Sequence, residues 1–165
     1  MQFKPALIAA ALVAASMGAS ATVYNIGVLP LAPAVYSNTV NVPAGAFSDT
    51  YNFSFPLTGD KASASAVSIQ LNGLLDISNL KVDLYDASNN WIAGGAVGNS
   101  SAVSNVPLMG GANYYYTVTG TATGAVGGAY AFIASASPIP EPGTYGLMLA
   151  GLGAVGFLAA RRRQA

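Results

Sequence analysis

Residues 47–55 read FSDTYNFSF, and this run indicates the fold of the whole middle of the chain. Aromatic residues and one aspartate alternate with serine, threonine and asparagine throughout the run. A period of two places every second side chain on the same face of a β-strand. Pro56 then ends the run, because proline has no N–H to give to a sheet. The pattern predicts a β-strand with one apolar face and one polar face.

Similar short runs recur between turns rich in glycine and asparagine. The strand candidates are residues 67–71, 80–85, 91–93, 114–119 and 129–133, with weaker ones at 23–26 and 39–42. Helical periodicity of any length is missing from residues 22–139. Strands of this length and spacing favour an all-β sandwich, and their alternation favours antiparallel pairing with one solvated face.

The composition argues against an enzyme. Charged residues make up 7% of the 165 residues, against about 25% in an ordinary soluble domain. The chain has no histidine and no cysteine, so the commonest general base, the usual zinc ligands and the thiol nucleophile are all missing. Residues 22–139 hold two lysines against five aspartates, which gives no basic surface for nucleic acid. We expect a protein without catalytic activity and without a cofactor.

The first 21 residues have the layout of a secretory signal peptide. Lys4 precedes an apolar run at residues 6–15, and Ala19-Ser20-Ala21 supplies the small residues that signal peptidase accepts. The apolar run is too short to cross ~30 Å of hydrocarbon at ~1.5 Å per residue. A buried helix of the folded domain is the alternative. We expect cleavage after Ala21 and a mature chain that begins at Thr22.

Residues 138–165 have the layout of a membrane anchor. Pro140-Glu141-Pro142 lies in a proline-rich stretch that should be extended rather than helical. Residues 144–160 carry no charge, and a helix of that length reaches about 25 Å, enough for a short transmembrane helix. The cluster Arg161-Arg162-Arg163 then holds this end in the cytoplasm. Both ends therefore predict that the middle, residues 22–137, is an ectodomain on the far side of the membrane.

The order of these C-terminal parts resembles the PEP-CTERM sorting signal of Gram-negative bacteria. That resemblance implies recognition by an integral-membrane exosortase and cleavage near Pro140-Glu141-Pro142. It also implies an intermediate anchored in the inner membrane, followed by release to the cell surface or to an extracellular matrix such as that of a biofilm. An ordinary C-terminal anchor is the alternative.

Two further resemblances concern the middle of the chain. Phe47-Ser48-Asp49-Thr50-Tyr51 is similar to the signature of the FxDxF group of PEP-CTERM proteins, with Tyr51 in the place of the second phenylalanine. Residues 40–133 resemble the pre-peptidase C-terminal domain in the spacing of their apolar, aspartate, tyrosine and glycine positions. This resemblance implies a jelly-roll-like accessory domain rather than a catalytic one.

Asp49 is the most informative charged residue, because it shares a strand face with aromatic residues. A carboxylate in such a place must be hydrogen-bonded, bound to a metal, or at the rim of the core. We favour hydrogen bonds from loop N–H groups at a sandwich edge. The alternative is a Ca²⁺ ligand together with Asp60, Asp83 or Asp86, although no D-x-D-x-D-G loop is present.

Asp83 and Asp86 are also the only two carboxylates in the sequence that we considered as the catalytic pair of a glycosidase. Asp83 is expected on a solvated strand face and Asp86 in a turn, because they lie three apart on or just past a strand. No other motif in the chain supports a glycosidase.

Aromatic residues provide the candidate ligand contacts. In the run Tyr114-Tyr115-Tyr116, alternation turns Tyr115 away from its two neighbours, so at least one face of this strand belongs to the core. Tyr115 and Trp91, which follows an asparagine-rich turn, are the candidates for stacking on sugar rings. We therefore expect a structural or interaction protein of the cell envelope or exopolysaccharide matrix. A carbohydrate-binding module is the alternative.

Overall fold

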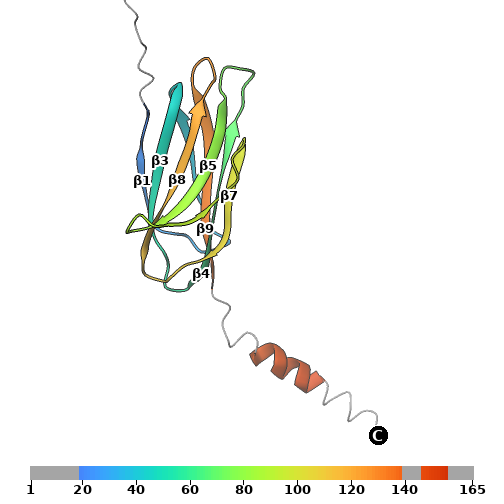
Figure 1. Ribbon diagram of the computed structural model, residues 1–165. Helices are drawn as coiled ribbons and strands as arrows, with labels where there is room; N and C mark the ends of the chain where they lie inside the picture. The colour runs from blue at the N-terminus through green and yellow to red at the C-terminus, as the bar shows by residue number, and fades with distance from the viewer. Residues whose placement is uncertain (1–18, 139–145, 156–165) are drawn as a thin grey trace, which may run out of the picture.

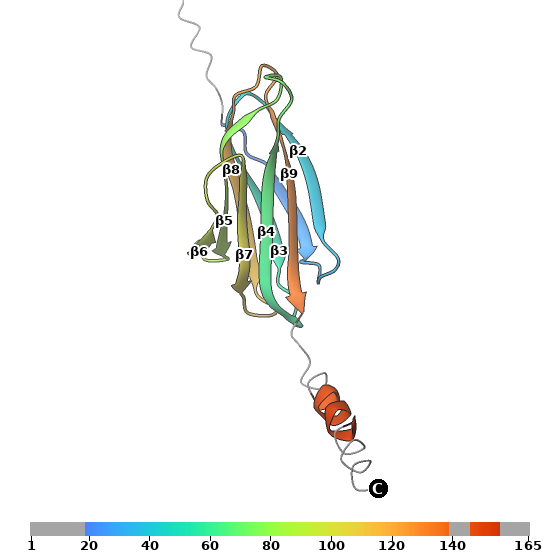
Figure 2. The same cartoon turned by 90° about the vertical axis from the view of Figure 1, so that its right-hand side faces the viewer.

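The chain forms a two-layer β-sandwich in the computed structural model, which describes residues 19–138 and 146–155 (Figure 1). One sheet has the strand order β1-β3-β8-β5-β6, and the other, which faces the viewer in Figure 2, has the order β2-β9-β4-β7. The strands are β1 Val23–Val28, β2 Tyr36–Val42, β3 Gly45–Ser54, β4 Gly59–Ile69, β5 Ile77–Asp86, β6 Trp91–Gly94, β7 Ser100–Pro107, β8 Asn113–Ala122 and β9 Gly128–Pro138. The predicted sandwich is thus confirmed.

Between the named strands, the pairing is antiparallel at every interface but one. β1 pairs with β3 in parallel, whereas β3–β8, β8–β5, β5–β6, β2–β9, β9–β4 and β4–β7 are antiparallel. The expectation of antiparallel pairing is therefore wrong for β1. Because β2 lies in the other sheet, the chain returns to the first sheet along β3 in the direction of β1.

The core lies between the two sheets and is rich in aromatic rings. In β3 the alternation of residues 47–55 holds, since Phe47, Tyr51 and Phe53 are all buried. Tyr51 stacks on Phe132 of β9 across the sandwich, with ring centroids 4.0 Å apart. Tyr116 of β8 is buried as well.

β4 and β7 differ from the sequence-based expectation. β4 begins at Gly59, well before the predicted start at residue 67, and β7 has no counterpart among the predicted strands. The core-facing residues of β4 are Ala62, Ala64 and Ala66, whereas Val67 is 49% exposed. Small residues can take the inner positions because the large rings of the opposite sheet fill the space between the layers.

Some predictions for the two ends of the chain concern residues outside those that the structure describes. These are the predicted signal peptide up to residue 18, Pro140-Glu141-Pro142, and Arg161-Arg162-Arg163. Residues 146–155 are helical, and the rest of the predicted segment 144–160 is not described. Within the described ranges, no helix combines the length and apolar character needed to cross a bilayer.

Candidate functional sites

Asp49 sits fully buried in β3 and accepts hydrogen bonds at both carboxylate oxygens. Oδ1 accepts the backbone N–H of Thr22 at 2.9 Å, and Oδ2 accepts the hydroxyl of Tyr130 at 2.6 Å. Tyr130 belongs to β9, so its hydrogen bond joins the two sheets. The hydroxyls of Tyr51 and Tyr130 lie 2.9 Å apart, and Tyr51 must be the donor because Tyr130 gives its proton to the carboxylate. The result is a buried chain of hydrogen bonds that ends on Asp49.

The tyrosines around Asp49 stay neutral and act as hydrogen-bond donors. Burial raises the pKa of Tyr130, and its hydrogen bond to Asp49 raises that pKa further. Burial likewise raises the pKa of Tyr51. Tyr24 of β1 stacks on Tyr51 at 4.7 Å, and its pKa is raised by burial and then by the charge of Asp49. None of these groups brings a positive charge to the carboxylate.

The favoured interpretation of Asp49 is confirmed in part. Asp49 does accept a backbone N–H at the edge of the sheet, from Thr22 just before β1. Its second partner, Tyr130, lies 81 positions away in the sequence and could not be paired with it from the sequence alone.

The aspartates considered as Ca²⁺ ligands do not come together. Asp60 lies at the start of β4, where its carboxylate is 3.7 Å from the ammonium of Lys61. Asp49 faces the core, whereas Asp83 and Asp86 lie at the other sites described below. In the described parts of the chain, no group of three or more His, Cys, Asp or Glu residues is placed to hold a metal ion.

A line of aromatic and amide residues crosses the outer face of the five-stranded sheet. The strand register aligns Trp91 of β6, Tyr85 of β5, Tyr115 of β8, Asn52 of β3 and Asn25 of β1, which we call the outer-face row. The rings of Tyr85 and Tyr115 stack with centroids 5.2 Å apart and planes 8° from parallel. The Asn52 amide donates to the Asn25 side-chain oxygen at 3.3 Å. Tyr115 thus points away from the core, as alternation predicts.

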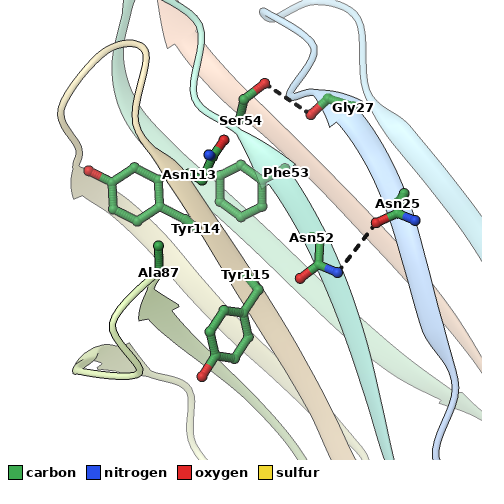
Figure 3. A pocket seen from close by; sticks show the side chains of 9 residues that line it. All are labelled: Asn25, Gly27, Asn52, Phe53, Ser54, Ala87, Asn113, Tyr114 and Tyr115. Carbon is green, nitrogen blue, oxygen red and sulfur yellow. Dashed lines mark hydrogen bonds between the residues drawn. The ribbon is translucent and has the colours of Figure 1, made fainter.

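One end of the outer-face row opens into a hollow of about 450 Å³ (Figure 3). Its lining consists of Asn25, Asn52 and Tyr115 from the row together with Gly27, Phe53, Ser54, Ala87, Asn113 and Tyr114. All of these residues are uncharged. Amide groups both donate and accept hydrogen bonds, and an aromatic ring offers an apolar face. This combination suits an uncharged ligand with many hydroxyl groups, such as a glycan.

Trp91 is held in place by the buried carboxylate of Asp83, which also pairs with the partly exposed Lys81. Its Nε1–H donates to Oδ1 of Asp83 at 3.1 Å, and the Lys81 ammonium lies 2.9 Å from Oδ2. Trp91 itself is 60% exposed, so its ring remains open to a ligand. Asp83 is buried, which corrects the expectation of a solvated residue. Asp83 does lie on the outer face of the sheet, but Trp91 and Lys81 cover its carboxylate.

Asp86 is the last residue of β5 rather than a turn residue, which corrects the prediction, although its carboxylate is hydrogen-bonded to the turn that follows. Its carboxylate accepts the backbone N–H groups of Ser88 and Asn90 and the Asn90 side-chain amide. These hydrogen bonds, the Asn90 side chain first among them, lower the pKa of Asp86. Tyr115 closes the same turn by donating its hydroxyl to Asn89 at 2.9 Å. The turn therefore supports one side of the outer-face row.

A comparison with known protein families identifies the C-terminal end of the chain. Residues 138–163 match the PEP-CTERM protein-sorting motif. The chain carries a PEP-CTERM sorting motif. This motif implies an exported protein that is processed by an exosortase, which is a membrane enzyme. The matched segment begins at Pro138, the last residue of β9, so the sorting motif starts where the sandwich ends.

Solved structures are similar to the sandwich at low sequence identity. The pre-peptidase C-terminal domain of a Bacillus anthracis collagenase is 18% identical with a TM-score of 0.41, over 67% of this chain and 93% of that chain. Aeromonas hydrophila PliG, a periplasmic inhibitor of g-type lysozyme, is 8% identical with a TM-score of 0.38, over 71% and 99%. A family two carbohydrate esterase from Clostridium thermocellum is 11% identical with a TM-score of 0.29, over 67% and 34%.

These likenesses carry no argument about function at such TM-scores. No curated protein matches the sequence.

Proposed function

We propose that the chain is an exported, non-catalytic protein of the cell surface or exopolysaccharide matrix, released from a C-terminal membrane anchor by an exosortase. The sorting motif at residues 138–163 carries this proposal. Residues 144–160 anchor the intermediate, and Arg161-Arg162-Arg163 keep its end in the cytoplasm. Cleavage near Pro140-Glu141-Pro142 leaves all nine strands on the released product, because β9 ends at Pro138.

The chemistry of the sandwich supports a role without catalysis. Both oxygens of the buried Asp49 accept hydrogen bonds, from Thr22 and Tyr130, and Asp83 is engaged by Trp91 and Lys81. A general acid or base needs access to a substrate proton, and neither carboxylate has it. The open hollow offers only uncharged groups.

Intact-mass spectrometry of cell-surface, medium and membrane fractions tests the proposal. We expect a surface species that begins at Thr22 and ends near Pro140–Pro142, and a membrane species that retains Arg161-Arg162-Arg163. Glu141→Gln changes the Pro-Glu-Pro motif without touching the apolar segment, so the membrane species should accumulate. A single membrane-bound species that keeps the arginines in the unmodified chain would contradict release and indicate a plain anchor.

The outer-face row favours a second function, the binding of a neutral glycan. Five adjacent strands at about 4.8 Å spacing give a row about 19 Å long, enough for several sugar units. Stacking rings at one end and amides at the other can contact both the apolar faces and the hydroxyl groups of such a chain. The row thus joins Trp91 and Tyr115, the two predicted ligand contacts, on one surface.

Retention on insoluble polysaccharides tests this second function. We expect Tyr115→Ala and Trp91→Ala to reduce retention several-fold. Ile133→Ala is the matched control, because Ile133 is 46% exposed on the opposite sheet. If the unmodified protein is retained by no glycan, the outer-face row is not a glycan site.

A further inference from the structure

The hydrogen bond from Thr22 to Asp49 departs from the regular sheet ladder. Ser48 and Thr50 of β3 donate their N–H groups to the carbonyls of Ser20 and Thr22 at 2.9 and 2.8 Å. The N–H of Thr22 instead turns to the Asp49 carboxylate at 2.9 Å, and residues 21–22 lie outside strand β1. The backbone nitrogen of Thr22 therefore points at a buried carboxylate rather than at a backbone carbonyl of the neighbouring strand β3.

The Asp49 carboxylate lacks a cationic partner among the described residues. The positively charged side chains there are Lys61 and Lys81, and they pair with Asp60 and Asp83. A buried carboxylate whose donors are all neutral is costly, and a cation at hydrogen-bond distance offsets this cost. The structure thus shows a buried negative charge with a backbone nitrogen, and no cation, beside it.

Signal peptide cleavage supplies the cation. Hydrolysis of the Ala21–Thr22 peptide bond consumes one water, leaves a carboxylate on Ala21 and converts the Thr22 nitrogen into an α-ammonium group. We propose that Asp49 is the binding site for this new N-terminus, so that processing creates an ion pair at the edge of the core. The inference rests on the proposed export, and on cleavage at the predicted site.

The geometry requires little movement to form this pair. The atom that becomes charged is already 2.9 Å from Oδ1 of Asp49. Cleavage also removes Ser20, which exchanges backbone hydrogen bonds with Ala46 and Ser48. The processed chain thus replaces two edge hydrogen bonds by an ion pair with a buried group.

The ion pair should be detectable as a raised pKa of the Thr22 α-amine. An α-amino group ordinarily has a pKa of about 7.7–8.0, and a carboxylate at this distance raises it. Groups that face the pair are Tyr24 of β1, Tyr51 of β3 and Tyr130 of β9, with Tyr36 of β2 beside Tyr51. Tyrosines ordinarily titrate near pH 10, and burial raises the pKa of Tyr24, Tyr51 and Tyr130 further. The α-amine therefore titrates before Tyr24, Tyr51 and Tyr130.

The sign of the stability effect follows from the raised pKa. The contribution of the ion pair is complete below about pH 7.7, the ordinary value of the free α-amine. It is lost as the pH rises through the higher value in the folded chain.

Amine acylation of the exported protein, recovered from cells after signal peptide cleavage, tests the inference at pH 7.5. Three proteins are compared: the unmodified chain, a chain with one alanine inserted between Ala21 and Thr22, and Asp49→Asn. Amino-terminal sequencing fixes the first residue of each, and peptide mass spectrometry gives the labelling rates. The insertion moves the α-amine one residue away and leaves an ordinary amide at Thr22. Lys61 serves as the internal reference, since none of these changes touches it.

We expect the Thr22 α-amine to be acylated roughly six- to eightfold more slowly than that of the inserted chain, since a rise of one unit from an ordinary pKa of about 7.7–8.0 lowers the unprotonated fraction at pH 7.5 by that factor. Asp49→Asn should restore the fast rate, and urea should abolish the difference. Equal rates in the unmodified and inserted chains overturn the inference even if Asp49→Asn does not fold, as does an exported chain that does not begin at Thr22. If the acylation rates are equal but the protein is still cut near Pro140–Pro142, the inference about Asp49 fails and the proposed function stands. If the protein is not exported, both the inference and the proposed function are contradicted.

Discussion

The hydroxyl of Tyr130 joins Asp49 to Tyr51, and removing it should be costly. Tyr130→Phe leaves Oδ2 of the buried carboxylate without a donor and Tyr51 without an acceptor. We expect the free energy of unfolding to fall by about 1–3 kcal/mol, the usual cost of an unsatisfied buried polar group. Urea unfolding measures this change.

Tyr116→Phe is the matched control for Tyr130→Phe. Tyr116 is equally buried, but its hydroxyl finds no partner among the described residues. Removing an unsatisfied hydroxyl should leave the free energy of unfolding unchanged or raise it. Equal losses in the two variants would mean that the hydrogen bonds of the Tyr130 hydroxyl contribute no more to stability than the unpaired hydroxyl of Tyr116 does.

Alkaline pH should destabilise the sandwich through its buried tyrosines. Burial raises the pKa of Tyr51, Tyr116 and Tyr130. Above about pH 10 the unfolded chain loses these protons while the folded chain keeps them, so the free energy of unfolding falls as the pH rises. The stabilisation is complete below about pH 10. Unfolding followed from pH 9 to 12 should show a steeper fall for the unmodified protein than for Tyr116→Phe.

The sequence predicts the type of environment of Asp49 but not its partners. Alternation with Phe47, Tyr51 and Phe53 places it on the buried face, and burial demands hydrogen bonds. Which groups donate depends on how the second sheet lies over the first, and nothing local in the chain specifies that. Tyr130 therefore became visible only in the structure.

At the scale of elements, β4 shows why the first part of a strand could not be predicted from the hydrophobic pattern. Its inner positions are alanines and its outer positions include Val67 and Ile69, so the hydrophobic pattern is reversed relative to the core. β7 has the same difficulty, because serine, alanine and asparagine make up most of it. Hydrophobic alternation indicates the buried face of a strand only where the buried residues are large. β3 and β5 have large inner residues, so the sequence predicts them.

The alanines of β4 should tolerate no larger residue. Ala66 is fully buried in a core of aromatic rings. Ala66→Leu overfills this space, and we expect the free energy of unfolding to fall by about 1–3 kcal/mol. Ser65→Leu adds a similar volume on the outer face of the same strand and should change it by about 0.5 kcal/mol or less. Urea unfolding of both variants checks the assignment of faces, and a larger loss for Ser65→Leu would contradict it.

For the molecule as a whole, the sequence was most informative about the ends and least informative about the surface between them. Trp91 and Tyr115 were each predicted as ligand contacts, but their alignment with Tyr85, Asn52 and Asn25 depends on strand register. Register is set by the bulges and by the pairing of distant strands. The bulge between Leu84 and Tyr85, for example, brings Trp91 opposite Tyr85.

Removal of the sorting tail should leave the stability of the sandwich unchanged. Among the residues that the structure describes, the nine strands end by Pro138 and the buried core residues lie between Leu29 and Ala136. We expect the thermal midpoints of the membrane species and the released species, measured in the same detergent, to differ by less than about 2 °C, since a loss of 1 kcal/mol moves the midpoint of a domain this size by about 4 °C or more. Glu141→Gln provides the uncleaved form for the comparison. A clearly lower midpoint for the released species would mean that the tail belongs to the folded domain, so that exosortase cleavage would destabilise the protein as well as release it.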